Sequence, residues 1–109
     1  MSHEGREAAV LAAVPKQLCI GGQWVDAERA ATFDVLDPAT GEVLCQVADA
    51  SPADGMRALE VAVAAQADFA ALPPQARADM LTRAFTLLHE RIDDLALLMT
   101  LEMGKPVAE

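Results

Sequence analysis

The spacing of apolar residues changes at Ser51, and this change limits the folds that the chain can adopt. Before Ser51, apolar and polar residues alternate in short runs, which is the pattern of half-buried β-strands. After Ser51, apolar residues recur at every third or fourth position, as in amphipathic helices. The sequence therefore predicts an α/β chain in which short strands come first and three helices follow. It lacks the strand–helix alternation that completes a parallel sheet, so we expect the fold to be incomplete as given.

The strand-forming part carries two turn signals. Gly21-Gly22 separates two short apolar runs and favours a tight β-hairpin. Further strands are predicted over residues 32–36 and 42–48, joined by a turn over 37–41 in which Asp37 can bond its own backbone and Gly41 can adopt a positive φ. We divide the chain into a leader with a short helix over 7–14 (1–17), a β-hairpin and strands (18–50), and a helical part (51–109).

The helical part has clear starts and stops. Ser51 is a predicted N-cap, with Pro52 in the first turn and Asp54 placed to close a capping box. Pro73-Pro74 ends the first helix, and Gly104 ends the third, which covers about 92–103. The apolar stripes predicted for the three helices are Met56, Leu59 and Val63; Met80, Leu81, Ala84, Phe85 and Leu88; and Leu95, Leu98 and Met99.

The net charge of −9 excludes partners that bind to clusters of Lys and Arg side chains. Nucleic acid and anionic membrane surfaces are such partners, so neither is expected. No apolar run is long enough to cross a bilayer, and we expect a cytoplasmic protein. Cys19 and Cys45 form no CxxC pair, and are predicted to be reduced thiols used as small apolar side chains.

Two sequence patterns that suggest chemistry fail on inspection. Gly104-Lys105 lacks the flanking residues of a phosphate-binding loop. His89-Glu90 lacks the second histidine of a zinc motif, because Asp93 occupies its place. From the residues alone we therefore predict no catalytic, cofactor-binding or metal-binding constellation in this chain.

Three segments in the same order resemble the N-terminal region of aldehyde dehydrogenases. Residues 18–27 (LCIGGQWVDA) resemble the family's INGEWVDA hairpin, and residues 37–43 (DPATGEV) resemble its NPATGEV turn. Residues 99–109 (MTLEMGKPVAE) are similar to LMTLEMGKPLAE, a form common among succinate-semialdehyde dehydrogenases. Asp37 replaces the usual asparagine, and both residues make the same turn. The resemblance covers about residues 16–109 and identifies the chain as the N-terminal part of the family's cofactor-binding domain.

The resemblance implies an activity that this segment cannot perform alone. Family members oxidise an aldehyde, here succinate semialdehyde, to the acid, using NAD or NADP and acting as homo-oligomers. A thiolate attacks the aldehyde, hydride passes to the cofactor, and water attacks the thioester. By resemblance the residues for these steps lie past residue 109. The family also implies a structural cation near Val35 and Glu102, although Glu102 can instead pair locally.

Missing parts of the domain would leave apolar faces without part of their cover. The residues on these faces are Val43, Val47, Leu59, Val63, Phe85 and Leu88. Such patches favour association. An alternative hypothesis is a small non-catalytic interaction module that keeps the family's N-terminal layer as a docking surface.

Overall fold

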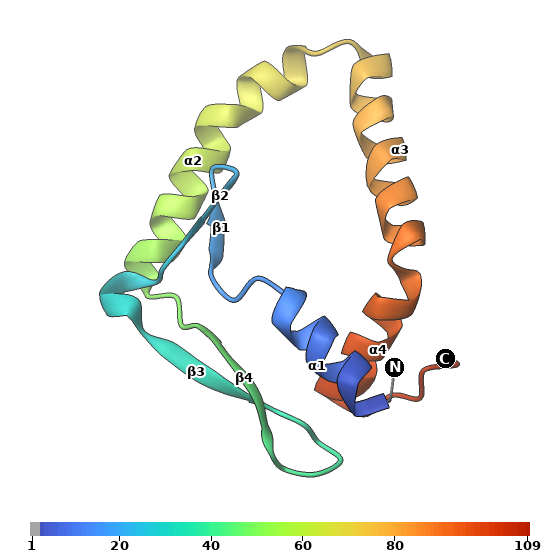
Figure 1. Ribbon diagram of the computed structural model, residues 1–109. Helices are drawn as coiled ribbons and strands as arrows, with labels where there is room; N and C mark the ends of the chain where they lie inside the picture. The colour runs from blue at the N-terminus through green and yellow to red at the C-terminus, as the bar shows by residue number, and fades with distance from the viewer. Residues whose placement is uncertain (1–2) are drawn as a thin grey trace.

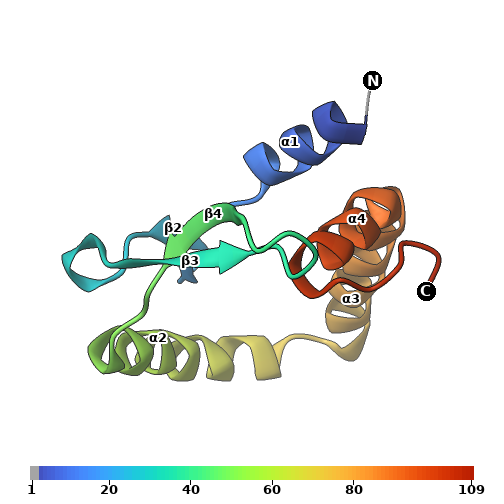
Figure 2. The same ribbon diagram turned by 90° about the horizontal axis from the view of Figure 1, so that it is seen from below.

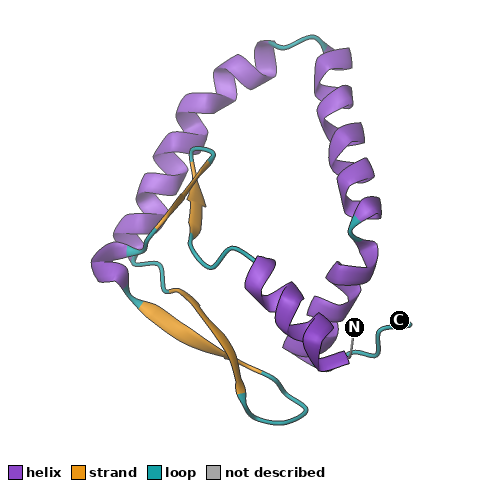
Figure 3. Cartoon of the chain, in the orientation of Figure 1, coloured by secondary structure: helices purple, strands orange, loops and turns teal. Residues whose placement is uncertain are grey.

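The computed structural model describes residues 3–109 as one helix, then strands, then three helices, in the predicted order (Figures 1 and 3). The elements are α1 (His3–Ala13), β1 (Leu18–Ile20), β2 (Gln23–Val25), the 3₁₀ turn η1 (Glu28–Ala30), β3 (Thr32–Leu36), β4 (Val43–Ala48), α2 (Pro52–Ala71), α3 (Pro74–Glu90) and α4 (Ile92–Met103). The predicted fold class is confirmed. In Figure 2, α2 lies on one side of the strands and α1 on the other.

The four strands form two separate antiparallel pairs, β1 with β2 and β3 with β4. Gly21 and Gly22 connect the first pair with φ of 63° and 75°, which glycine adopts without a Cβ clash. In the turn of the second pair, the Ala39 N–H donates to Asp37 Oδ1 at 2.8 Å, as expected for an aspartate before proline. Local turn chemistry therefore fixes both hairpins.

Backbone hydrogen bonds join the two hairpins and hold the entry to α2. The Ala48 N–H donates to the Lys16 carbonyl, and the Asp49 N–H donates to the Ala31 carbonyl, each at 2.8 Å. Between β2 and β3 the chain turns through Arg29 and Ala30 with φ of 61° and 53°. Neither is a glycine or an asparagine, so nothing in the sequence indicated this left-handed turn.

Helix α4 ends against the turn between β3 and β4. Gly104 follows α4 with φ of 78°, as the C-terminal glycine signal predicted. A Cβ placed on Gly104 would lie 3.3 Å from Pro38 Cγ. Glycine is therefore favoured here both by its backbone conformation and by the close approach of the proline ring.

The helix at the start of the chain is longer than expected and packs on α4. It begins at His3 rather than at residue 7, and the first two residues of the predicted leader lie outside the described part. Val10 is buried, and Arg6 lies 3.9 Å from Asp94. The Lys16 ammonium donates to the Leu11 and Val14 carbonyls, which satisfies acceptors at the helix end.

The described elements enclose very little core. Only Val10, Ala27 and Leu101 are buried apolar residues in the part of the chain that the structure describes. The radius of gyration is 17.1 Å, although a compact domain of this length would have about 13 Å. Figure 1 accordingly shows α2, α3 and α4 as consecutive sides of an open frame. Among residues 3–109, no helix has the length and apolar character to cross a membrane.

The apolar faces expected to lack cover are exposed, with one exception. The exposed residues of that set are Val43, Leu59, Val63, Phe85 and Leu88, with 54–60% of their surface accessible. Val47 is the exception, because it is half-buried. Val47 is paired with Phe33 across the β3–β4 ladder, and side chains paired in this way lie on the same face of the sheet.

Candidate functional site

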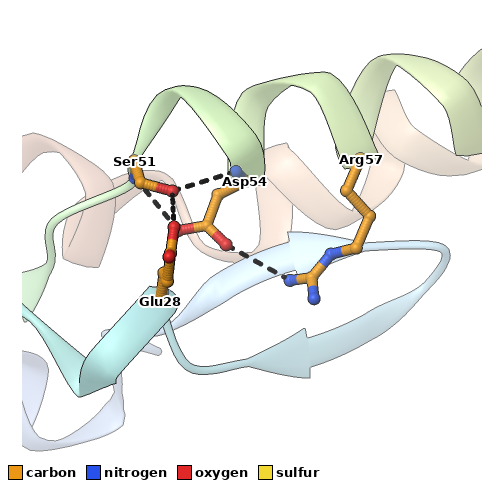
Figure 4. A network of polar contacts seen from close by, with 4 residues as sticks. All are labelled: Glu28, Ser51, Asp54 and Arg57. Carbon is orange, nitrogen blue, oxygen red and sulfur yellow. Dashed lines mark hydrogen bonds and ion pairs between the residues drawn. The ribbon is translucent and has the colours of Figure 1, made fainter.

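The most densely bonded polar cluster surrounds Asp54, at the start of α2 (Figure 4). The Ser51 hydroxyl accepts from the Asp54 N–H at 3.1 Å, and the Ser51 N–H donates to Asp54 Oδ2 at 3.0 Å. These two bonds are the predicted capping box. The Glu28 N–H also donates to Asp54 Oδ2, at 2.9 Å, and the Ser51 hydroxyl donates to Glu28 Oε2 at 2.7 Å. The cluster thus ties η1 to the first turn of α2.

Hydrogen bonds hold the pKa of Asp54 below its ordinary value near 3.8. The main causes are the backbone N–H groups of Glu28 and Ser51, which stabilise the carboxylate. Burial opposes this effect, while the Ser51 hydroxyl and the Arg57 guanidinium, 3.6 Å from Oδ1, add to it. Asp54 therefore stays ionised at neutral pH, and its side chain is only 6% exposed.

The Asp54 cluster is suited to holding the fold and not to proton transfer. A general acid or base works best when its pKa lies near the operating pH, and the shift at Asp54 is in the opposite direction. Both Asp54 oxygens are already engaged. The sequence predicted Ser51 and Asp54, and the i,i+3 spacing of Arg57 could have added it. Glu28 carried no signal, because it lies 26 residues from Asp54.

Neither cysteine is placed as a nucleophile. Cys19 lies exposed on β1, and Cys45 is half-buried on β4 opposite Val35. Both are free thiols, as predicted. No hydrogen bond or ion pair joins either thiol to a basic side chain within residues 3–109, so neither has the neighbour that activates a catalytic thiolate.

The two positions implied for a structural cation lie near the same corner of the molecule. Val35 is half-buried next to the bulge at the end of β3, and Glu102 is exposed in the last turn of α4. Gly104, two residues after Glu102, lies against Pro38, three residues after Val35, and this contact brings the end of α4 close to the end of β3. At most they offer one backbone carbonyl and one carboxylate, fewer oxygens than the roughly six that hard cations take. No metal-binding group of three His, Cys, Asp or Glu side chains occurs in the described residues. The pair does not by itself form a cation site.

A hollow of about 490 Å³ lies between α1 and α4. Its lining residues are Val10, Ala13, Val14, Pro15, Arg91, Asp94, Leu95 and Leu98. Asp94 already pairs with Arg6, so Arg91 is the one charged lining group without a described partner that could orient a ligand. A ligand site needs several convergent polar groups, and this hollow lacks them.

Comparison with known proteins places the chain beside one family. The model of the aldehyde dehydrogenase family matches residues 24–109. A succinate-semialdehyde dehydrogenase from Burkholderia pseudomallei is 47% identical over 85% of this chain, with a TM-score of 0.82. An E. coli NADP-dependent enzyme is 40% identical over 85% of the chain, with a TM-score of 0.83.

A third structure, PnpE in complex with nicotinamide adenine dinucleotide, is 32% identical over 86% of the chain, with a TM-score of 0.82. In all three cases the match covers 19% of the other protein's chain. The present chain therefore spans about one fifth of the length of the structures it resembles. The matched 85–86% of the chain superposes on that fifth.

Proposed function

Because the chain belongs to the aldehyde dehydrogenase family, we propose that it forms the N-terminal layer of an enzyme that oxidises an aldehyde to a carboxylic acid. The net reaction combines the aldehyde, water and the oxidised nicotinamide cofactor, and yields the acid, a proton and the reduced cofactor. The bound cofactor would supply the hydride acceptor. Whether that cofactor is NAD or NADP is open, since PnpE carries the first and the E. coli enzyme is named for the second.

Succinate semialdehyde is the substrate that we propose. The single observation supporting it is the 47% identity to a succinate-semialdehyde dehydrogenase, with a TM-score of 0.82 over 85% of this chain. The proposal does not rest on a substrate pocket in this chain. It also includes a cytoplasmic homo-oligomer, as the family resemblance implies.

Residues 3–109 contribute architecture to this reaction. The Asp54 cluster fixes the start of α2, and the glycine at position 104 lets α4 end beside the β3–β4 turn. Neither thiol has an activating base, and the Asp54 carboxylate stays ionised. We therefore propose that the chain alone is inactive. Any contribution of Val35 and Glu102 to a structural cation would need oxygen ligands from other parts of the enzyme.

One observation favours the alternative, a non-catalytic interaction module. Large apolar side chains on all three long helices are exposed, as on a docking surface. A module that folds independently should be compact, however, and the radius of gyration of 17.1 Å exceeds the roughly 13 Å of a compact domain. The extended shape therefore supports the enzyme assignment over the independent module.

The test is a steady-state assay of the complete natural polypeptide that carries this sequence. We expect kcat/KM for succinate semialdehyde to exceed that for butyraldehyde, which has the same carbon chain and no carboxylate, by at least about tenfold. Each substrate is measured with NAD and with NADP, and the 109-residue chain is the control without activity. No oxidation of either aldehyde by the complete polypeptide contradicts the enzyme assignment, and a preference for butyraldehyde contradicts the proposed substrate.

A further inference from the structure

Helix α3 carries an apolar stripe, Leu81, Phe85 and Leu88, which we call the α3 stripe. Its three residues follow at intervals of four and three, so they lie on one side of the helix. Between 57% and 72% of each residue is exposed. The opposite face of α3 is polar, with Asp79, Arg83, Thr86 and Glu90. A helix with this division is normally buried along its apolar side.

Helix α2 has a second uncovered apolar face. Val61 faces the β1–β2 hairpin, since its Cγ1 lies 3.4 Å from the position of a Cβ on Gly21. Met56, Leu59 and Val63 lie on the far side of the helix from Val61, because successive residues advance by about 100°. These three residues are 56–60% exposed. Helix α2 is thus apolar on two sides, and the hairpin covers only one of them.

The uncovered area is large enough for a stable partner. The chain exposes 8257 Å², whereas a compact protein of its mass would expose about 5,800 Å². The excess of about 2,400 Å² is roughly three times the 800 Å² that each partner buries in a standard interface. A surface of this size fits a partner that is held permanently and buries much of both helices.

We propose that the α3 stripe and the outer face of α2 bind the remaining four fifths of an aldehyde dehydrogenase chain, and do so even when the two parts are separate polypeptides. The inference rests on the proposed function. Its occupant follows from the length of chain that this sequence does not span, since each match covers 19% of its relative. A covalent link between the two parts would give each an effective concentration of about millimolar near the other, and separate polypeptides lack this advantage. The uncovered area is large enough for the two parts to associate without the link.

The elements are also locally complete, which favours recognition without a covalent link. The capping box begins α2, Pro73 and Pro74 separate it from α3, and Gly104 ends α4. Helix α2 therefore has its own start and stop signals, α3 has its own start and α4 its own stop, so less of the chain has to become ordered on binding.

A second copy of this chain is a poorer occupant than the rest of the enzyme. The chain has 17 acidic and eight basic side chains, with a net charge of −9. Two copies would both carry a net negative charge, and the electrostatic repulsion between them opposes their association. The proposal therefore commits to the complementary part of the enzyme.

The experiment co-expresses the 109-residue chain with the Burkholderia pseudomallei enzyme from which the matched segment has been removed. We expect the two polypeptides to co-purify, and Phe85→Asp or Leu81→Asp to raise the dissociation constant at least tenfold. Thr86→Asp is the matched control, because it adds the same charge to the polar face of α3, and it should change the constant less than twofold. Circular dichroism checks that the variants keep their helix content.

A fused chimera of the same two parts separates the outcomes. An active chimera whose separate parts do not associate overturns the inference and leaves the proposed function standing. A complex that forms beside a correctly folded but inactive chimera counts against the proposed function and leaves the docking standing. Two results overturn the assignment of the stripe to this partner. One is an equal rise in the dissociation constant for Phe85→Asp and Thr86→Asp. The other is self-association of the 109-residue chain that Phe85→Asp abolishes.

Discussion

Replacing Ser51 with alanine should loosen the first turn of α2 and leave the rest of the helix unchanged. The substitution removes the hydroxyl that accepts from the Asp54 N–H at 3.1 Å and that donates to Glu28 Oε2, in an exposed bond, at 2.7 Å. The other half of the capping box remains, because the backbone N–H of residue 51 still donates to Asp54 Oδ2. We therefore expect the loss of one N-cap, about 1 kcal/mol, rather than of the whole cluster.

Amide hydrogen exchange of the complete polypeptide measures this loss locally. A change of 1 kcal/mol in the opening equilibrium corresponds to about fivefold faster exchange. The increase should be confined to the amides at the start of α2, including Asp54 and Gly55. Ser51→Thr keeps an acceptor oxygen at the same place and should change exchange less than about twofold.

Two results would refute the reasoning about this cap. Unchanged exchange at Asp54 in Ser51→Ala would mean that the hydroxyl does not hold the turn. Equal acceleration in Ser51→Thr would mean that the side chain's packing matters and its hydrogen bond does not.

Three further predictions concern stability and are checked by unfolding of the complete polypeptide. The pKa of Asp54 is lower in the folded chain than in the unfolded chain, so the contribution of its carboxylate to stability is complete above the ordinary value near 3.8 and is lost as pH falls through the lowered pKa. Asp54→Asn should therefore lower stability at neutral pH and remove this pH dependence in the acid range. Gly104→Ala places a Cβ on a residue with φ of 78° and 3.3 Å from Pro38, and should lower the free energy of unfolding by about 1–2 kcal/mol. Gly55→Ala is the contrasting case, because its Cβ inside α2 meets open space, and it should raise the free energy of unfolding by about 0.4–1 kcal/mol. Leu101→Ala empties a buried position on α4 and should cost about 2–3 kcal/mol, and a cost below about 0.5 kcal/mol would show that the α4 contacts do not need this side chain.

Features decided by a few neighbouring residues could be predicted from the sequence. Gly21-Gly22 indicated a two-residue hairpin, and Ser51 with Asp54 indicated the start of α2. Each of these signals depends on backbone conformation or on hydrogen bonds between residues at most a few positions apart. The same reasoning located Gly104 as the end of the third helix.

Features that join distant segments could not be predicted. The bond from the Glu28 N–H to Asp54 spans 26 residues, and the Arg6–Asp94 pair joins opposite ends of the chain. The left-handed turn at Arg29 lacks a residue that favours it. Periodicity showed that α2 is apolar but did not show that Val61, rather than the predicted stripe, faces the hairpin.

Size-exclusion chromatography with far-UV circular dichroism of the 109-residue chain tests the central claim most directly. The claim is that the apolar faces of α2 and α3 need the rest of an aldehyde dehydrogenase to cover them. It predicts helical signal, elution as an expanded species, and no single cooperative melt until the complementary part is added. A compact monomer that melts cooperatively on its own would contradict it, because such a chain would have covered these faces without a partner.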